Sequence, residues 1–329
     1  MKYKKLGISD LKVSTIAMGC MAIAGGITFG PQDEKQAIDA IKTAYNCGIN
    51  FFDTAEAYEN GYSEELVGRG LEDCRSKVII ASKVSKEHLK PKDVKKACEN
   101  SLKRLRTDYI DVYYIHWPNL EIPFAETMGA MEELKQEGKI RVIACSNFGK
   151  NDMKNLLSKG RVEANELPYS LLFRAIEFDI VDLCIKNNVS ITCYSPLVHG
   201  LLTGKFKSPD DVPDGRARTR HFSCKRPMAR HSEKGAEKET FNVINEIRKI
   251  SHELNISMAQ LSLAWVLNQP GITSVLAGAR NSEQVNMNVK AAETELTLDV
   301  LEKLNKITET LKNKLGSNPD MWQTESRIN

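Results

Sequence analysis

Short apolar runs alternate with longer segments of helical periodicity along most of the chain. The first apolar run covers residues 15–19. The segment over 33–47 that follows places Ile38, Ile41 and Tyr45 on one face of a helix. Asp33 is a suitable N-cap for this helix, with Gln36 three residues further on. A second run at 49–53 precedes a helical segment at 63–71. The pattern therefore predicts strands and helices in alternation.

Six further units continue this alternation. Strands are predicted at 77–83, 110–116, 139–145, 161–166, 189–194 and 272–276, and the helices that follow them at 91–106, 124–137, 151–158, 176–187, the pair 239–255 and 257–269, and 282–291. A closed parallel barrel fits this order, and an open doubly wound sheet is the rival arrangement. The regularity of eight units favours the α/β class with a (β/α)8 TIM barrel.

Two segments fall outside the eight units. Residues 1–13 are predicted to form a hairpin that closes one end of the barrel. Residues 297–315 are predicted to form an extra C-terminal helix with its leucines on one face. A chain of 329 residues is long enough for two domains, but α/β barrels of this length are single units. Since no segment resembles a linker, we expect residues 1–329 to form one domain.

Composition narrows the functional classes. With 46 basic and 43 acidic residues the net charge is +3, which does not favour a nucleic-acid or membrane-surface partner. No apolar run approaches the roughly 18 residues that span a membrane, and the N-terminus shows no signal core. The eight cysteines include no CxxC pair and indicate neither a disulfide framework nor a zinc site. We therefore expect a reduced, cytoplasmic protein, and its oligomeric state stays open.

Three successive predicted strands carry an ionisable residue at their carboxyl ends. Asp53 closes GINFFD, Lys83 closes VIIASK and His116 closes VYYIH. Each residue alone is typical of a loop cap or a structural side chain. In a parallel barrel, however, all carboxyl ends open on one mouth, where the active sites of this fold lie, so the three together predict a functional cluster. A metal site is not predicted, because HExxH is absent and the lysine would repel a cation.

Tyr58, in the loop after the second strand, supplies a fourth polar group. An isolated phenol has a pKa of about 10 and is a poor acid at neutral pH. A nearby ammonium group at Lys83 is expected to lower that pKa by about 1–3 units, and Asp53 is needed to keep the lysine charged. The set is predicted to be a proton donor with its tuning partners.

At these residues the sequence resembles the aldo-keto reductase family. The family signature is matched by GINFFDTAEAYENGYSEELVGRGL over 48–71, with Asp53 and Tyr58 at catalytic positions; IASKV supplies Lys83 and YIDVYYIHWP supplies His116. The similarity spans residues 1–312 in order. It implies an NADPH-dependent oxidoreductase that reduces a small aldehyde or ketone to an alcohol. The nicotinamide would give a hydride to the carbonyl carbon, Tyr58 would give a proton to its oxygen, and His116 would orient it.

The resemblance also implies NADPH/NADP+ contacts at the ends of the later strands. Ser146, Asn147 and Glu166 match positions that hold the nicotinamide carboxamide, and Tyr194 matches the residue that stacks on the ring. The pyrophosphate region corresponds to Ser195, Pro196, Leu197 and Lys205, and the adenosine end to Gly278, Arg280, Gln284 and Asn288. A helix N-terminus there favours a phosphate, which Arg280 would grip; a solvated loop charge is the alternative interpretation of this arginine.

Two positions depart from the family pattern. Glu166 stands where the family often has glutamine, and an ionised glutamate cannot donate a hydrogen bond to the carboxamide oxygen. Met287 replaces a glutamate common near the adenine amine. No GxGxxG follows a strand, so a Rossmann site is not predicted, and the glycines at 61, 68 and 70 are interpreted as turn and packing residues.

On the substrate side, Met21, Tyr58 and Trp117 are predicted to line the pocket floor. In this family the C-terminal segment can fold across the mouth, so the tail 313–329 would present Trp322 as a substrate wall or as an anchor of the tail. The loop 210–234 is rich in basic residues: Arg216, Arg218, Arg220, His221, Lys225, Arg226, Arg230 and His231. We hypothesise that this loop screens the pyrophosphate or, through Arg226 and Arg230, recruits an anionic substrate. A solvated loop is the alternative.

Two other functions fit parts of the pattern. A non-enzymatic NADP(H)-binding regulatory subunit, like the potassium-channel β subunits that share this barrel, would retain the same four residues; the lack of an added segment before the first strand favours the reductase. An isomerase or lyase that uses Lys83 as a Schiff-base amine is the third hypothesis. That chemistry favours an unpaired lysine, whereas Asp53 is expected to keep this one protonated.

Overall fold

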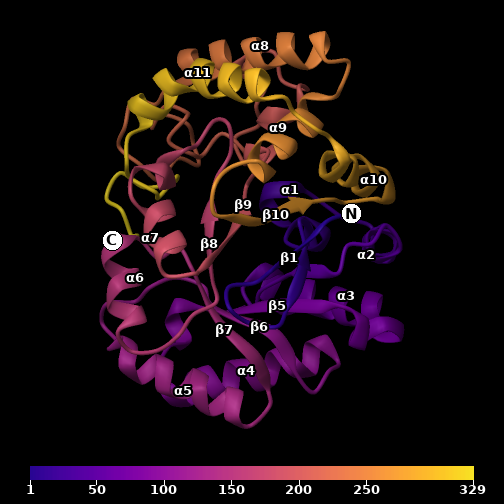
Figure 1. Cartoon of the computed structure of the whole chain (residues 1–329), viewed down its shortest axis with the longest axis vertical. Coiled ribbons are helices and arrows are strands. Elements are labelled where there is room, and N and C mark those ends of the chain that lie inside the picture. The colour runs from indigo at the N-terminus through magenta and orange to yellow at the C-terminus, as the bar shows by residue number, and fades with distance from the viewer.

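Eight parallel strands close into a barrel in the computed structural model, which describes residues 1–329 (Figure 1). In order around the barrel they are β3 (Ile16–Gly19), β4 (Phe51–Asp53), β5 (Ile79–Val84), β6 (Ile110–Ile115), β7 (Ile140–Ser146), β8 (Ala164–Pro168), β9 (Ser190–Tyr194) and β10 (Ile272–Gly278), and β10 pairs with β3. Every residue of β5 and β6 is buried, because helices cover the outer face and side chains fill the interior. The predicted (β/α)8 barrel is confirmed.

Each barrel strand is followed by a helix that packs on the outside of the barrel. These helices are α2 (Glu34–Asn46), α3 (Tyr62–Leu71), α4 (Pro91–Leu105), α5 (Phe124–Gln136), α6 (Lys150–Leu157), α7 (Ile180–Lys186), α9 (Met258–Leu267) and α10 (Ser282–Lys290). The Asp33 side chain accepts a hydrogen bond from the Gln36 backbone N–H at 2.8 Å, so the predicted N-cap of α2 is confirmed. None of the helices combines the length and apolar character needed to cross a bilayer.

Two predicted elements differ from the observed ones. The helix predicted over 176–187 is split into a 3-10 turn, Ala175–Phe178, and α7, because the backbone of Asp179 is not helical (φ −160°, ψ −19°). The strand predicted at 161–166 begins only at Ala164. Arg161 lies in the loop before β8, where its guanidinium donates to the carbonyls of Asn187 and Asn188.

An N-terminal hairpin closes the floor of the barrel, at the amino ends of the strands. It consists of β1 (Tyr3–Lys5) and β2 (Lys12–Ser14), which pair antiparallel. Leu6, Leu11 and Val13 of the hairpin are buried against inward-facing barrel residues such as Phe51. The mouth at the opposite end is therefore the open face of the barrel.

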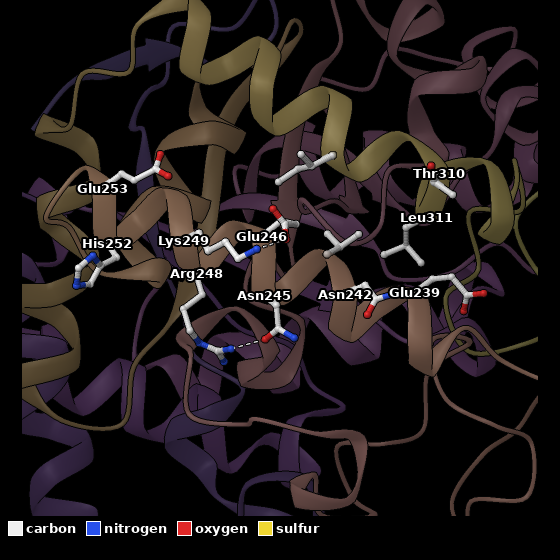
Figure 2. A pocket seen from close by; sticks show the side chains of 12 residues that line it. Glu239, Asn242, Asn245, Glu246, Arg248, Lys249, His252, Glu253, Thr310 and Leu311 are labelled. Carbon is white, nitrogen blue, oxygen red and sulfur yellow. Dashed lines mark hydrogen bonds and ion pairs between the residues drawn. The ribbon is translucent and has the colours of Figure 1, made fainter.

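Two long helices lie side by side along one edge of the molecule (Figure 1). They are α8 (Glu237–Glu253), which precedes α9, and the predicted C-terminal helix α11 (Leu298–Leu315). Between them lies a groove of about 1120 Å³ lined mainly by polar side chains; Glu246 and Lys249 of α8 pair with each other along one wall (Figure 2). This groove includes none of the strand-end residues singled out above, so it is separate from the mouth.

Three segments cover the mouth. They are the loop after β3, which contains the single helical turn α1 (Gly26–Phe29), the long loop between β9 and α8, and the C-terminal residues 316–329. Gly68 and Gly70 in α3 allow close packing, since a Cβ there would lie 2.6 Å from the Leu105 carbonyl oxygen and 2.7 Å from Ile41. Their interpretation as packing residues is confirmed, since they let α3 approach α4 and α2 closely.

Candidate active site

Asp53, Tyr58 and Lys83 meet at the mouth of the barrel. The Lys83 ammonium, on β5, donates to Asp53 Oδ1 at 2.5 Å, to the Thr54 carbonyl oxygen at 3.0 Å and to the Tyr58 hydroxyl at 3.3 Å. Asp53 is the last residue of β4, and Tyr58 opens a 3-10 turn, Tyr58–Gly61, in the loop that follows. Pairing of the adjacent strands β4 and β5 thus brings Lys83 to Asp53, 30 positions earlier in the chain, and to Tyr58, 25 positions earlier.

The environment of Lys83 keeps its amine protonated. Burial alone would lower the pKa of Lys83, but the neighbouring acidic groups, Asp53 foremost, outweigh burial and hold the pKa well above its usual value. The side chain is fully buried and every polar neighbour is an oxygen. This charge state does not suit a Schiff-base amine, which must be free to attack as the neutral form.

The pKa of Tyr58 does not follow the expectation from the sequence. Burial raises the pKa of the phenol above its usual value; Lys83 lowers it, and Asp53 and Glu166 raise it further. The expected direction of the lysine effect is confirmed, but the expected net lowering is wrong because desolvation and two carboxyl groups oppose one ammonium group. Tyr58 is therefore a protonated phenol at neutral pH, as a proton donor must be.

His116 lies beside the phenol as a neutral imidazole. It directly follows β6, and its ring meets the Tyr58 ring edge-on, with the centroids 5.8 Å apart. Burial and the charge of Lys83 lower the pKa of His116 to about 3. A neutral imidazole next to a phenol can hydrogen-bond a carbonyl oxygen without adding a second positive charge to the site.

Glu166, predicted to face the nicotinamide carboxamide, lies against the lysine instead. Its Oε1 is 3.4 Å from the Lys83 ammonium, and its Oε2 has no hydrogen-bond partner although it is buried. Glu166 is on β8, on the far side of the barrel from Asp53 on β4, so only closure of the barrel brings the two carboxyl groups together.

Ser146, Asn147 and Tyr194 form a hydrogen-bonded group on the neighbouring wall. The Tyr194 hydroxyl donates to Asn147 Oδ1 at 2.7 Å, and Asn147 Nδ2 donates to the His116 carbonyl oxygen and to Ser146 Oγ, both at 3.0 Å. Asn147 has a left-handed backbone (φ 64°), and strained backbone of this kind clusters at ligand sites. The residues expected to hold the nicotinamide thus share one network with His116.

Trp322 from the tail and Trp117 after β6 enclose this wall. The Trp322 ring is parallel to the Tyr194 ring, with an interplanar angle of 7° and centroids 5.9 Å apart, and it meets Trp117 edge-on at 6.3 Å. The Arg327 guanidinium lies 4.0 Å from the centroid of the Trp117 ring. Trp322 therefore covers one face of the ring expected to stack on nicotinamide. Met21 follows β3 and is largely exposed at the mouth.

The loop after β9 and the start of α10 gather basic side chains that no carboxylate neutralises. Burial and the charge of Arg216 lower the pKa of Lys205, and burial and the charge of Arg280 lower the pKa of Arg216. A Cβ at Gly200 (φ 96°) would lie 3.1 Å from Lys205 Nζ and 3.4 Å from Arg216 Nη1, so glycine leaves a cradle between the two cations. Repelling, half-buried cations of this kind fit a bound pyrophosphate.

Several residues expected at this end have defined structural partners. Ser195, Pro196 and Leu197 directly follow β9, and the backbone of Ser195 is left-handed (φ 52°). The Arg280 guanidinium donates to Gln32 Oε1 and to the carbonyl oxygens of Phe29 and Pro31. The backbone N–H of Arg280 donates to Gln284 Oε1. Asn288 Nδ2 donates to the carbonyl oxygen of Gly278, the last residue of β10. Arg280 thus keeps an unneutralised charge while it holds the loop after β3.

The basic loop 210–234 divides into fixed and unneutralised residues. Arg226 pairs with Glu237 at 3.2 Å and Arg220 pairs with Glu233 at 2.7 Å, so neither guanidinium is available for recruitment of an anion. The hypothesis that Arg226 recruits an anionic substrate is not supported, since its charge is neutralised within the protein. The sequence placed Arg216 in the basic loop 210–234 but did not single it out as a residue that could contact the cofactor. The run of charges offered no signal to distinguish it from Arg220 or Arg226.

Comparisons with known proteins agree with this geometry. The sequence model described as "Aldo/keto reductase family" matches residues 15–309. An "NADH-specific methylglyoxal reductase" from Escherichia coli (strain K12) is 32% identical over 90% of this chain and 95% of its own length. A "probable voltage-gated potassium channel subunit beta" from Oryza sativa subsp. japonica is 31% identical, over 94% of this chain and 97% of its own. The crystal structure of an aldo/keto reductase from Klebsiella pneumoniae with NADP and acetate superposes with a TM-score of 0.72 at 29% identity, covering 90% of this chain and 92% of that one.

Proposed function

Since the chain belongs to the aldo/keto reductase family, we propose that it is an NADPH-dependent oxidoreductase that reduces a small aldehyde or ketone to the alcohol, with Tyr58 as the proton donor. The observation that carries the proposal is the position of the Lys83 ammonium, which contacts both Asp53 Oδ1 and the Tyr58 hydroxyl. Such an arrangement stabilises the phenolate that remains once Tyr58 has given up its proton.

Each of the four residues has a separate role in the reduction. When bound, the dinucleotide supplies the hydride that adds to the carbonyl carbon. Tyr58 gives its hydroxyl proton to the carbonyl oxygen, so that one hydride and one proton produce the alcohol. Lys83 stabilises the phenolate, Asp53 holds Lys83 in its charged form, and the neutral imidazole of His116 hydrogen-bonds the carbonyl oxygen and orients it.

The residues at the mouth fit a dinucleotide. Ser146, Asn147 and Tyr194 would hold the nicotinamide end, and Lys205 with Arg216 would hold the pyrophosphate, because their repelling charges lack acidic partners. Gly278, Gln284 and Asn288 shape the loop that carries Arg280, which would face the 2′-phosphate at the start of α10. Met21, Trp117 and Trp322 would border the carbonyl substrate.

Oxidation of NADPH in the presence of a panel of aldehydes and ketones, followed by absorbance, tests the proposed function. We expect turnover with small carbonyl compounds, and NADPH preferred to NADH. Turnover with NADH alone, as the name of the Escherichia coli relative describes for that protein, would contradict the cofactor assignment. Tight NADPH binding without turnover of any carbonyl would favour the regulatory alternative, which the resemblance to potassium-channel β subunits supports.

Arg280 offers a sharper test of the cofactor preference. Arg280→Gln removes one positive charge and is expected to raise the Kd for NADPH about tenfold or more, the effect of losing a charge-assisted hydrogen bond of about 1.5–3 kcal/mol. The Kd for NADH should not change, because NADH has no 2′-phosphate. An equal rise of the Kd for NADPH and for NADH would show that Arg280 does not contact the 2′-phosphate. Its role would then be only to hold the loop after β3, through its hydrogen bonds to Phe29 and Gln32.

A further inference from the structure

Two buried carboxyl groups face a single ammonium group in the proposed active site. Asp53 Oδ1 is 2.5 Å from Lys83 Nζ and Glu166 Oε1 is 3.4 Å from it. The two acidic side chains are 4% and 3% exposed, so water cannot screen them. Both carboxyl groups therefore lie within 3.4 Å of the same ammonium nitrogen, and a single positive charge can neutralise only one of them.

The remaining groups around this cluster offer no second positive charge. The titratable residues that act on Asp53, Glu166 or Lys83 come from all sides of the barrel: Cys20 after β3, Tyr58 after β4, Tyr114 on β6, His116 after β6, and Cys193 and Tyr194 on β9. Burial keeps the phenols and thiols of this set protonated and the imidazole neutral. With both carboxyl groups ionised, the cluster would hold one unpaired negative charge away from water, which is strongly disfavoured.

We propose that Glu166 is a neutral carboxylic acid that shares its proton with Asp53, and that this shared proton leaves the charge of Lys83 free to act on Tyr58. Glu166 is thus a positioning residue, because it acts through Asp53 and Lys83 and not on the substrate. The catalytic part of this inference depends on the proposed function, whereas the protonation state of Glu166 does not.

The directions of the pKa shifts agree with this assignment. Burial raises the pKa of both carboxyl groups, and that of Glu166 lies well above its usual value, while two hydrogen-bonding partners oppose the shift at Asp53. Asp53 is nearer the ammonium, so it keeps the negative charge and Glu166 keeps the proton. The cluster of Lys83, Asp53 and Glu166 is then neutral overall.

Protonation of Glu166 has a consequence for catalysis at high pH. When Tyr58 gives up its proton, a phenolate forms 3.3 Å from Lys83, and one neighbouring carboxylate already shares that charge. Loss of the Glu166 proton would add a second carboxylate, and since Glu166 acts to raise the pKa of Tyr58, the phenol would become a weaker acid. The rate of reduction should therefore fall as Glu166 ionises with rising pH.

A neutral Glu166 also explains how this residue can stand where the family often has glutamine. A carboxylic acid presents one O–H donor and one acceptor oxygen, as an amide presents a donor and an acceptor, whereas a carboxylate only accepts. One of its oxygens, Oε2, is buried and lacks a partner. In the protonated form the O–H is shared with Asp53, and the other oxygen can still accept a hydrogen bond.

Infrared difference spectroscopy of the protein without cofactor tests the protonation state directly. We expect that wild type minus Glu166→Gln shows the C=O stretch of a protonated carboxylic acid at neutral pH, with a shift in D2O. Glu177→Gln is the matched control, because hydrogen bonds from Arg174 hold the pKa of Glu177 below its usual value despite burial, so no such band should be lost. Absence of the band in the wild-type spectrum overturns the proposal. If Glu166→Gln does not fold, a pH titration of the C=O band in the wild-type protein alone tests the proposal. The band should then disappear only at alkaline pH.

The pH profile of turnover tests the positioning role. Glu166→Gln should lose the fall of kcat/KM at high pH that ionisation of Glu166 causes in wild type, because the amide has no proton to release in this range. A large increase of kcat/KM in Glu166→Gln at neutral pH would show that Glu166 is ionised in wild type, and would overturn the proposal. If the protein reduces no carbonyl compound, the infrared result still stands, so failure of the proposed function is distinguishable from failure of this inference.

Discussion

Lys83 is a buried cation, and burial of a charge costs free energy unless other groups compensate it. The residues around Lys83 supply that compensation. The ammonium group is completely buried, and its partners are Asp53, the Thr54 carbonyl, Tyr58 and Glu166. A buried ion pair contributes little net stability, because desolvation offsets much of the attraction, yet removal of one partner leaves the other unpaired. This arrangement is therefore better explained by function than by stability.

Replacement of the lysine should reveal that cost. Lys83→Met is expected to destabilise the fold by about 3–5 kcal/mol at pH 8, measured by urea unfolding, because Asp53 is left buried without its cation. The loss should become smaller as pH falls. In Lys83→Met, the buried Asp53 carboxyl binds a proton in the folded state at a pH where Asp53 of the unfolded chain has already released it. Lower pH therefore favours the folded form.

Lys35→Met is the matched control, since Lys35 forms an exposed pair with Asp39 on α2 and its replacement should hardly change the free energy of unfolding. A similarly small effect for Lys83→Met would contradict the buried, charged pair.

The sequence predicted the residues of this cluster better than their environment. Asp53, Lys83 and His116 could be predicted because each ends an apolar run, and the fold brings all such ends to one mouth. The net pKa shift of Tyr58 was predicted wrongly, since its degree of burial depends on loops whose paths the sequence pattern does not specify. The approach of Glu166 to Lys83 could not be predicted either, because it depends on closure of the barrel between β4 and β8.

At the level of elements, a buried carboxylate, Asp320, holds the middle of the C-terminal segment across the mouth. Asp320 is completely buried; it accepts from the Trp322 N–H at 3.0 Å and from Arg327 Nε at 2.6 Å. The Arg220 guanidinium donates to the carbonyl oxygens of Leu315 and Asn318 and so fixes the start of the segment. The position of Trp322 over Tyr194 therefore depends on Asp320.

Asp320→Ala should loosen this segment without unfolding the barrel. Loss of hydrogen bonds to a buried charge, worth about 1.5–3 kcal/mol, should make chymotryptic cleavage at Trp322 about tenfold faster. The KM of the carbonyl substrate should rise if Trp322 borders it. Asp320→Asn keeps an acceptor oxygen and should lie between wild type and Asp320→Ala. An unchanged cleavage rate in Asp320→Ala would show that other contacts hold the tail.

Helices and strands could be predicted where burial of one face imposes a regular spacing of apolar residues. Short turns without such a spacing could be predicted less well. The barrel strands and the N-cap of α2 follow directly from apolar runs and capping chemistry. The 3-10 turn that begins at Tyr58 and the turn at α1 have no such period, since their conformation is set by contacts with neighbouring loops. The same holds for the break at Asp179.

For the whole molecule, three histidines at the mouth are held in their neutral form. Burial lowers the pKa of His116 and of His199 to about 3, and that of His221 to about 4. The unfolded chain binds protons at these residues below about pH 6.5, whereas the folded chain does not. The folded state is therefore expected to lose stability as pH falls from about 6.5 towards 4. Glu166 opposes part of this trend, because the folded state holds its proton.

His221→Gln isolates one part of that pH dependence. His221 is completely buried, with its ring nitrogens bonded to the Leu172 carbonyl and the Thr219 hydroxyl. Its replacement should reduce the slope of unfolding free energy against pH between about 5 and 6 by up to about 1.4 kcal/mol per pH unit. His252→Gln, at an exposed position on α8, should leave the slope unchanged. Equal slopes for wild type and His221→Gln would show that the buried imidazole is charged in the fold.

In the proposed function, the protonated phenol of Tyr58, paired with Lys83, delivers the proton in carbonyl reduction. The most direct measurement compares NADPH oxidation by wild type and Tyr58→Phe with the best aldehyde of the panel, alongside NADPH binding followed by fluorescence. We predict that kcat falls by about 10²–10⁴ in Tyr58→Phe, because only the hydroxyl is lost, while the Kd for NADPH does not change. Turnover by Tyr58→Phe at the wild-type rate would contradict the account.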